Sequence, residues 1–533
     1  MRLGCAKLSI LRIMFIQRSF NITSLCQPST FCLFFVLLGV FVRVFLFSQD
    51  FDLIPDEARL SASIWHAGFQ DIFAGRLTFN QNAPLGFLLT VKILAFFFGS
   101  SELILRLLPF IAGILLFPLA YKFAIKEFNE KFACIFLFFL VCSEPLLFYS
   151  IQFKQYSVEA FIALFWVYKR ERLANWNFIL LAMVSILFSS TAPLILAGIC
   201  ISHFILLPKT LKSMIPKLLA LAVFSAAYYF LWLNQLEGKN FMNSFWDGFW
   251  FPNLNFIQFI GRHFINLTPY ITQYEPSVYL YAALTIVLSL LGFYFLFKEH
   301  KSIAIIILVT LFSILLMYFL KIYPLGIPLD PILNQTENFA MAQVVGSRLM
   351  VYFIPVIFIA ISFGLYKILG ILNSRYFAIS CILLIVLSLS PNIGRMQTGL
   401  GAAEYFALLE KTKPYLTEKS VILMSTFNST VHTYYQRNNL QNEYFSISYM
   451  FREAILMEPI QNIEIGKSFV FYEYSDLFSS LKYLGVNRAI FIFANYDSYQ
   501  MQFLKYLPEY LKQTSYEWLM FPAKDAAAVV VDF

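Results

Sequence analysis

Charged residues are scarce in this sequence. Only 13% of its 533 residues are Asp, Glu, Lys or Arg, and 59% are hydrophobic, whereas soluble domains have about 25% charged residues. So few charges cannot solvate the surface of a soluble protein of this size, which excludes the ordinary soluble enzymes. The net charge of +8 does not indicate a nucleic-acid partner either, because Lys and Arg lie in short clusters between apolar runs, where they set membrane topology.

Metal-binding and nucleotide-binding motifs are also missing. None of the seven cysteines belongs to a CxxC or Cys/His pattern, the five histidines are scattered, and no glycine-rich nucleotide-binding loop occurs. No metal site, disulfide framework or cofactor is therefore predicted. The sequence does not decide whether the protein requires a divalent metal ion.

Long apolar runs dominate the chain instead. A helix needs about 20 apolar residues to cross the hydrocarbon of a bilayer. Runs near this length occur at 31–48, 102–121, 132–149, 157–168, 177–191, 192–207, 214–234, 277–297, 302–320, 349–366 and 376–392. The sequence therefore predicts a polytopic all-α membrane protein with about eleven transmembrane helices.

Residues 1–30 precede the first span and are basic. They contain Arg2, Lys7, Arg12 and Arg18, and no small-residue cleavage site follows the span. This pattern predicts an uncleaved signal-anchor with a cytoplasmic N-terminal tail. A multi-pass protein of the plasma (inner) membrane is expected.

Residues 83–98 are apolar but short, and Lys92 lies in their middle. If they do not cross the membrane, the later cytoplasmic loops hold 13 Lys and Arg and the outer loops hold five. If they cross, this ratio is inverted, against the positive-inside rule. We therefore predict an outer juxtamembrane helix at 83–98, within an outer loop 49–101, and an extracytoplasmic C-terminus.

The last part of the chain, 393–533, has a different composition. It contains 12 Lys and Arg and 14 Asp and Glu, and helical patterns at 402–412 and 477–484 alternate with β-rich runs. These runs are Val421–Thr426, Phe469–Tyr474, Ala489–Ala494 and Ala528–Phe533. The alternation predicts a small soluble α/β domain outside the membrane.

The outer loop after the first span begins with a cluster of carboxylates, Asp50, Asp52, Asp56 and Glu57, followed by Arg59. Carboxylates near a bilayer are costly unless they are solvated or functional. One interpretation is a solvated loop in which Asp56 caps a short helix. The other is a general base acting on an acceptor, with Arg59 close enough to bind an anion.

A second outer segment joins the third and fourth spans. It places Lys154 and Glu159 at the mouths of neighbouring helices, flanked by Tyr149 and Tyr156. This combination suits an anionic sugar phosphate. The alternative interpretation is an interfacial ion pair within an aromatic belt.

A third outer segment contains Tyr323-Pro324 and, further on, Arg348 at the start of the tenth span. Arg348 either snorkels to lipid headgroups or reaches the phosphate of a lipid-linked donor. Most other ionisable residues of the spans lie at helix ends, and Arg43 and Arg106 are the exceptions.

The order of these motifs over about 30–390 resembles the GT-C membrane glycosyltransferases, in particular the branch of protein O-mannosyltransferases and lipid A aminoarabinose transferases. The resemblance is carried by Asp56-Glu57-Ala58-Arg59, Asn82-Ala83-Pro84-Leu85, Ser101-Glu102-Leu103-Ile104-Leu105-Arg106-Leu107-Leu108-Pro109, Phe148-Tyr149-Ser150, Lys154-Gln155-Tyr156-Ser157, Tyr323-Pro324 and Ser347-Arg348-Leu349. Two positions depart from the pattern: Ala83 replaces a usual proline, and Lys154 stands where arginine is common.

The resemblance implies a glycosyltransferase domain at 31–392 that takes a sugar from a polyprenyl-phosphate donor at the outer (periplasmic) face. It implies Asp56 as catalytic base and Glu57 as its positioning neighbour. It assigns substrate binding to Arg59, Lys154 and Arg348, which would bind the donor phosphate, to Glu159, which would contact sugar or acceptor, and to Asn82, Tyr156 and Tyr323. A catalytic metal is not generally needed in this branch.

The chemistry agrees with this implication. Transfer from a prenyl phosphate needs a base for the acceptor and cations for the departing phosphate, both at headgroup height. The acceptor class (protein, lipid or glycan) stays open. Two other functions remain as alternatives: a transporter or flippase of lipid-linked sugars, which predicts mid-span charges and repeated halves, and a non-catalytic membrane subunit, which leaves the Asp56 cluster without a task.

Overall fold

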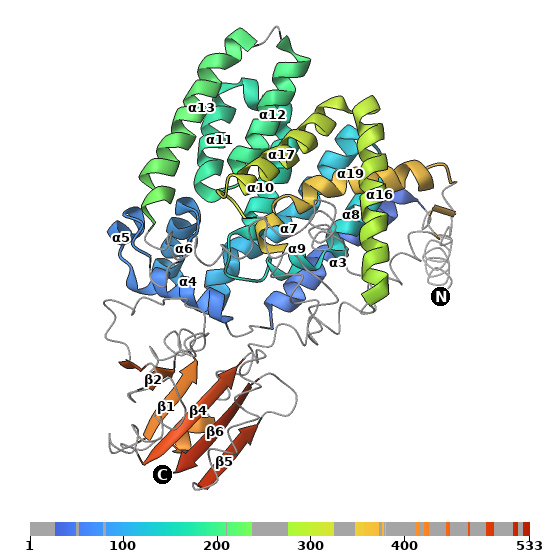
Figure 1. Ribbon diagram of the computed structural model, residues 1–533. Helices are drawn as coiled ribbons and strands as arrows, with labels where there is room; N and C mark the ends of the chain where they lie inside the picture. The colour runs from blue at the N-terminus through green and yellow to red at the C-terminus, as the bar shows by residue number, and fades with distance from the viewer. Residues whose placement is uncertain are drawn as a thin grey trace, which may run out of the picture.

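The computed structural model describes residues 27–49, 53–77, 81–208, 211–236, 275–324, 347–372, 376–377, 379, 411–415, 420–425, 444–447, 467–469, 487–494, 515–520 and 526–532. Within these ranges the chain forms a bundle of helices and a β-sheet, and the sheet lies at the end of the molecule where the short helix α4 lies (Figure 1).

Helices occupy the predicted apolar runs that fall in the described ranges. They are α3 (Pro28–Phe47), α7 (Glu102–Glu127), α8 (Glu130–Cys142), α9 (Glu144–Phe148), α10 (Tyr156–Lys169), α11 (Trp176–Phe188), α12 (Ala192–Leu206), α13 (Leu211–Leu231), α16 (Glu275–Glu299), α17 (Lys301–Phe319) and α19 (Ile354–Leu369). The mostly helical architecture is therefore confirmed. The run 376–392 lies outside the described residues except for 376, 377 and 379.

Five helices in the described part are long and apolar enough to cross a membrane. They are Pro28–Phe47, Glu102–Glu127, Lys212–Gln235, Ala282–Glu299 and Lys301–Phe319. The helices α6 (Leu85–Phe98), α11, α12 and α19 are equally apolar in character but shorter. The number of spans and their direction stay predictions from the sequence.

The predicted span 132–149 is interrupted. Ser143 has extended backbone angles (φ −77°, ψ 105°) and separates α8 from the short helix α9, which has Pro145 in its first turn. Proline has no backbone N–H and its ring clashes with the carbonyl of the preceding turn, which favours a helix break just before Pro145. The loop after α9 carries Lys154.

The segment between the first two predicted spans folds into α4 (Pro55–His66), α5 (Phe69–Phe73) and α6. The helix expected at 83–98 is therefore present. Its Lys92 ammonium donates a hydrogen bond to the carbonyl of Ile64 at 2.5 Å, which ties α6 to the end of α4. The side chains of Phe96, Phe97 and Phe98 are exposed, so the described part of the protein does not cover the C-terminal end of α6.

Glycine allows α16 and α19 to cross closely. A Cβ atom at Gly292 would overlap the carbonyl oxygen of Ala360, and one at Gly364 would overlap that of Leu288. Small residues of this kind let two helix backbones approach within a membrane protein. The crossing fixes α19, and Arg348 lies shortly before α19 in the chain.

The C-terminal sheet has the strand order β3-β2-β1-β4-β6-β5. Its strands are β1 (Ser420–Ser425), β2 (Tyr444–Ile447), β3 (Lys467–Phe469), β4 (Arg488–Ala494), β5 (Ser515–Met520) and β6 (Ala526–Asp532). Strands β3, β2, β1 and β4 pair in parallel, and β6 runs antiparallel to both of its neighbours, β4 and β5. Parallel strands need crossover connections, as in α/β domains. The predicted helix 477–484 and most of 402–412 lie outside the described residues.

Candidate functional site

The site begins at the N-terminus of α4. Ile54 is extended and precedes Pro55, whose fixed φ and missing N–H suit the first helical position. Asp56 and Glu57 therefore occupy the first turn, where the helix dipole favours negative charge. The two carboxylates have different environments: the Asp56 side chain is 36% exposed, and that of Glu57 is completely buried. Asp50 and Asp52 lie outside the described residues.

Two cations from different parts of the chain converge on Asp56. Its Oδ2 lies 3.1 Å from the Nζ of Lys154 and 3.9 Å from an Nη of Arg348. Lys154 comes from the loop between α9 and α10, and Arg348 comes from the short 3-10 helix η5 (Arg348–Met350) that leads into α19. Three of the predicted site residues thus meet at one carboxylate oxygen.

Electrostatics keep Asp56 ionised. Partial burial raises the pKa of its carboxyl group, but the positive charges of Lys154, Arg348 and Arg59 outweigh this effect, and the pKa of Asp56 is lowered from its usual value. Burial also lowers the pKa of Lys154, against the effect of Asp56. Burial lowers the pKa of Arg59 as well, and the charge of Asp56 again opposes it. An ionised carboxylate is the form that accepts a proton.

Lys154 is held in place by several contacts. Its side chain is only 6% exposed, its backbone N–H donates to the carbonyl of Gln152 at 2.8 Å in a tight turn, and its ammonium donates to Oε1 of Gln81 at 2.9 Å. Gln81 was not predicted from the sequence. Its neighbour Asn82, which was predicted to bind substrate, is exposed at the start of α6.

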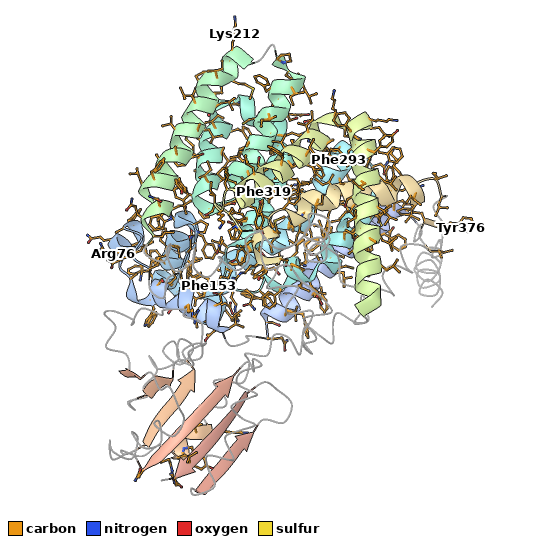
Figure 2. The ribbon with its side chains drawn as sticks, in the orientation of Figure 1. Arg76, Phe153, Lys212, Phe293, Phe319 and Tyr376 are labelled. Atoms are coloured by element: carbon orange, nitrogen blue, oxygen red, sulfur yellow. The ribbon has the colours of Figure 1, made fainter. Side chains whose placement is uncertain are left out.

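Glu57 forms a buried ion pair with Arg106 of α7. Its Oε1 accepts from Nε of Arg106 at 2.8 Å, and its Oε2 accepts from Nη2 at 2.7 Å. The same carboxylate accepts hydrogen bonds from the backbone N–H groups of Ile54, at 3.1 Å, and of Phe153. The ring of Phe153 stacks on Phe87 of α6, with centroids 5.8 Å apart, near α4 and α6 in Figure 2.

The second intramembrane arginine, Arg43 of α3, has a different environment. Its guanidinium lies over the ring of Phe117, 4.6 Å from the centroid, and donates to the carbonyl of Gly39 at 3.2 Å. Arg43 therefore contributes to the packing of α3 against α7.

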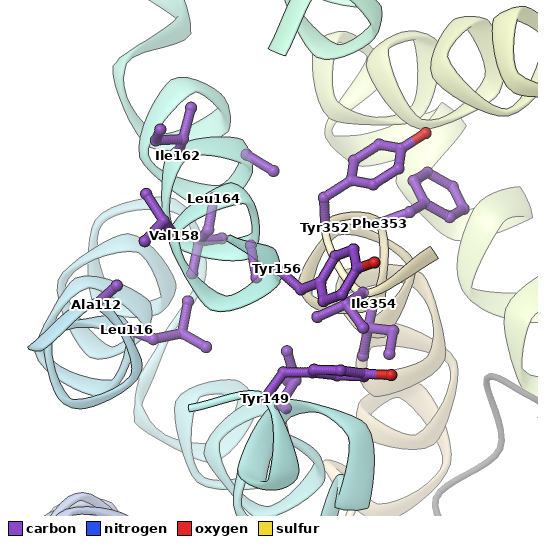
Figure 3. Close-up of a cluster of buried hydrophobic side chains, with 14 of the residues drawn as sticks. Ala112, Leu116, Tyr149, Tyr156, Val158, Ile162, Leu164, Tyr352, Phe353 and Ile354 are labelled. Atoms are coloured by element: carbon purple, nitrogen blue, oxygen red, sulfur yellow. The ribbon is translucent and has the colours of Figure 1, made fainter. Parts of the chain in front are cut away.

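Tyrosines line one side of the site. The rings of Tyr149 and Tyr156 pack edge to face, with centroids 4.7 Å apart, and both interact electrostatically with Asp56 and Arg348. Tyr323 donates to the carbonyl of Leu349 at 2.8 Å, so it holds the turn that carries Arg348. Figure 3 shows the hydroxyl groups of Tyr149, Tyr156 and Tyr352 directed to the same side of α10.

Glu159 lies in the first turn of α10 and is buried. Its carboxyl accepts a hydrogen bond from the backbone N–H of Ser190. It interacts electrostatically with the hydroxyl groups of four tyrosines, Tyr156, Tyr228, Tyr323 and Tyr352. The structure therefore brings Glu159 to the tyrosine side of the site.

Several buried polar atoms beside these tyrosines have no hydrogen-bond partner within the described part of the protein. They are the hydroxyl of Tyr352, Oε1 of Gln155 and Oγ of Ser157. Buried polar groups are normally satisfied, so such atoms call for a water or ligand. Among the described residues, no three His, Cys, Asp or Glu side chains are grouped to hold a metal ion.

The tyrosines Tyr228 and Tyr352, together with Gln81, were missed by sequence reasoning, and no local pattern distinguishes them. The position of Arg106 inside a predicted span does indicate a buried partner, because ionisable residues within spans are usually paired. That partner is Glu57.

Comparison of the sequence with family models and with curated proteins finds no match. Comparison with solved structures does. ArnT from Cupriavidus metallidurans in the apo state gives a TM-score of 0.52 at 12% identity, over 94% of this chain and 98% of ArnT. ArnT bound to undecaprenyl phosphate gives 0.47 at 13% identity, over 93% and 97%. The archaeal oligosaccharyltransferase AglB from Archaeoglobus fulgidus, in complex with an inhibitory peptide and a dolichol-phosphate, gives 0.43 at 12% identity, over 93% and 73%.

The protein thus has the polytopic membrane fold of ArnT, an aminoarabinose transferase of the GT-C membrane glycosyltransferases. The resemblance expected from the motifs is confirmed at the level of the fold. A shared fold hosts different functions, so the function has to be argued from the site.

Proposed function

We propose that this protein is an integral membrane glycosyltransferase that moves a sugar from a polyprenyl-phosphate donor to an acceptor at the outer face of the plasma membrane. The observation that supports it most is the placement of the Asp56 carboxylate beside two cations, with Lys154 at 3.1 Å and Arg348 at 3.9 Å. The outer topology, the domain limits 31–392 and 393–533 and the polyprenyl carrier are part of the proposal.

The proposed reaction needs a base and an anion site side by side. Asp56 removes the proton of the acceptor group, whose freed electron pair attacks the anomeric carbon of the sugar. The bond between that carbon and the phosphate oxygen breaks, and its electron pair leaves with the phosphate. Lys154 and Arg348 stabilise the charge on the departing phosphate, and Arg59 adds a third positive charge near Asp56.

The sugar is proposed to bind on the tyrosine side. Tyr156 and Glu159 lie one helical turn apart at the start of α10. Buried polar atoms of Tyr352 and Gln155, which have no hydrogen-bond partner among the described residues, lie in the same part of the protein. Aromatic faces with a few hydrogen-bonding groups are a common lining for small-molecule sites. Asn82 is proposed to contact substrate from the exposed loop before α6, and Tyr323 through the turn that carries Arg348.

The test is transfer of labelled sugars from a panel of undecaprenyl-phosphate-linked monosaccharides by membranes containing wild type, Asp56→Asn or Asp71→Asn. Asp71 is a matched control, because it is an acidic residue of the same outer segment and its carboxylate pairs with Arg76 at 2.6 Å, away from Lys154. Transfer lost only in a normally inserted Asp56→Asn variant supports the proposal.

Equal transfer by Asp56→Asn removes Asp56 as the base. No transfer by wild type, together with movement of the labelled lipid across the membrane, supports the flippase alternative instead. No transfer and no lipid movement favours a non-catalytic membrane subunit.

A further inference from the structure

Glu57 connects three segments that build the site. Its carboxylate binds the guanidinium of Arg106 on α7, the backbone N–H of Ile54 before α4, and the backbone N–H of Phe153 in the loop that precedes α10. The residue after Phe153 is Lys154, and the residue before Glu57 is Asp56. The two bonded residues, Glu57 and Phe153, are therefore the direct chain neighbours of the two residues that meet in the site.

The lone pairs of Glu57 are fully used. An ionised carboxylate offers about four acceptor positions. Four donors occupy them: Nε and Nη2 of Arg106 and the two backbone N–H groups of Ile54 and Phe153. With its side chain completely buried, Glu57 has no free position for the proton of an acceptor. Its chemistry is that of a fixed anchor.

Arg106 makes this anchor possible. A carboxylate without exposure needs a compensating charge, and removing one partner of a buried ion pair leaves an uncompensated charge. The Arg106 side chain is itself only 4% exposed, and its bidentate contact fixes the orientation of the carboxylate plane. Without Arg106, Glu57 would draw in water or a proton, and its bond to the loop at Phe153 would weaken.

We propose that Arg106 is a positioning residue, which holds Lys154 against Asp56 by fixing Glu57 and, through it, the backbone at Phe153. The importance of Arg106 for catalysis rests on the proposed function. The placement of Lys154 by Arg106 does not depend on that function, and it can be tested without any transfer reaction.

The experiment measures acetylation of the Lys154 amine in the purified full-length protein, by mass spectrometry, in wild type and Arg106→Gln. The rate is taken at high pH, where the amine is unprotonated in both proteins, so that it reports access to the amine. Lys154 is almost buried in wild type. We expect its acetylation to be about tenfold faster in Arg106→Gln, because loss of a buried ion-pair partner releases the loop.

Arg170→Gln is the matched control. Arg170 pairs with Glu127 at 2.6 Å, and both side chains are nearly buried, with 8% and 9% exposure. Glu127 lies in the last turn of α7, the helix that carries Arg106 near its start. Arg170→Gln should therefore destabilise the protein to a similar degree and leave Lys154 acetylation unchanged. An equal rise in both variants would mean general loosening and would overturn the proposal.

Two further variants cover a failure of Arg106→Gln to fold. Arg106→Lys keeps the charge but not the bidentate contact, and Glu57→Gln keeps the shape of the side chain but not its charge. Each variant should raise the rate of Lys154 acetylation, and the increase should be smaller for Arg106→Lys than for Glu57→Gln. A wild-type rate in folded Arg106→Gln, or in both of these variants, overturns the proposal.

Transfer assays then separate this inference from the proposed function. If Lys154 leaves Asp56, the pKa of Asp56 rises, and the acid limb of the pH profile of transfer moves to higher pH in Arg106→Gln but not in Arg170→Gln. If wild type transfers no sugar while Lys154 acetylation responds to Arg106 as expected, the proposed function fails and the positioning stands.

Discussion

The ammonium of Lys154 lies 3.1 Å from a carboxylate oxygen of Asp56, although Asp56 belongs to α4 and Lys154 to the loop between α9 and α10. Lys154 is mostly buried and Asp56 is partly exposed, so the charge pair is accessible to solvent on the side of Asp56. This pair defines the candidate site and underlies most of the predictions below.

Replacing Lys154 should remove transfer without unfolding the protein. Lys154→Gln keeps a hydrogen bond to Gln81 possible but removes the charge that stabilises a departing phosphate. Loss of one such group typically lowers kcat by about 100-fold to 1,000-fold. The measurement is kcat for sugar transfer, with Lys92→Gln as control, since Lys92 donates to a backbone carbonyl on α4. A kcat for Lys154→Gln within a few-fold of wild type would contradict the role.

The pH dependence of transfer should lack an acid limb near neutrality. The base is active when ionised, and the pKa of Asp56 is lowered from its usual value because Lys154 and Arg348 outweigh the effect of burial. A lowered folded-state pKa stabilises the protein above the unfolded-state pKa of about 3.9, and this stabilisation is lost as pH falls through the folded-state value. The profile of kcat/KM should therefore show no loss from Asp56 between about pH 7 and pH 5. A limb centred near pH 6 that disappears in Asp56→Asn would contradict this.

Arg348 should act mainly through donor binding. Its guanidinium lies 3.9 Å from the carboxylate of Asp56, and the proposed function assigns it to the donor phosphate. Arg348→Lys keeps the charge but not the planar fork that matches phosphate oxygens, so we expect a rise of about tenfold in the KM for the donor, equal to about 1.4 kcal/mol. Arg348→Gln should raise it further. Unchanged donor KM in both variants would place the phosphate elsewhere.

Tyr352→Phe and Tyr323→Phe should have opposite effects. The hydroxyl of Tyr352 is buried and has no hydrogen-bond partner in the described part of the protein, so its removal should leave the Tm of the ligand-free protein unchanged or higher. Tyr323 donates to the carbonyl of Leu349, and its loss should destabilise the protein by about 1 kcal/mol. Transfer assays on Tyr352→Phe should show a raised donor KM. A lowered Tm in Tyr352→Phe would show that its hydroxyl is bonded within the protein.

Gly292→Ala should destabilise the helical bundle. The added methyl group would overlap the carbonyl oxygen of Ala360 on α19, and overpacking of this kind costs about 1–3 kcal/mol. The check is the Tm of the detergent-solubilised protein. Leu290→Ala is the control, because Leu290 lies on the same helix with an exposed side chain. A Tm equal to wild type for Gly292→Ala would mean that α16 and α19 do not cross closely at this point.

The sequence predicted the helices well, because a bilayer-length apolar run has few alternatives to helix once its backbone must be bonded internally. It did not predict the break at Ser143, since the run 132–149 is apolar on both sides of it and only Pro145 marks the interruption. It predicted the β1, β4 and β6 strands closely. It missed β2 (Tyr444–Ile447) and β5 (Ser515–Met520), although most residues of both strands are apolar or aromatic.

For the candidate site too, the sequence indicated some features and the tertiary structure decided the others. The composition and the apolar helices were determined by the sequence, and Asp56, Lys154 and Arg348 were singled out from it by the scarcity of charges near the ends of apolar runs and by the family resemblance. Only the tertiary structure decided their partners. Asp56 and Glu57 are neighbours in the chain, yet one meets Lys154 and the other meets Arg106. Consecutive residues of a helix point in directions about 100° apart, and which direction faces a cation depends on how α4 packs against α7, which no local pattern records.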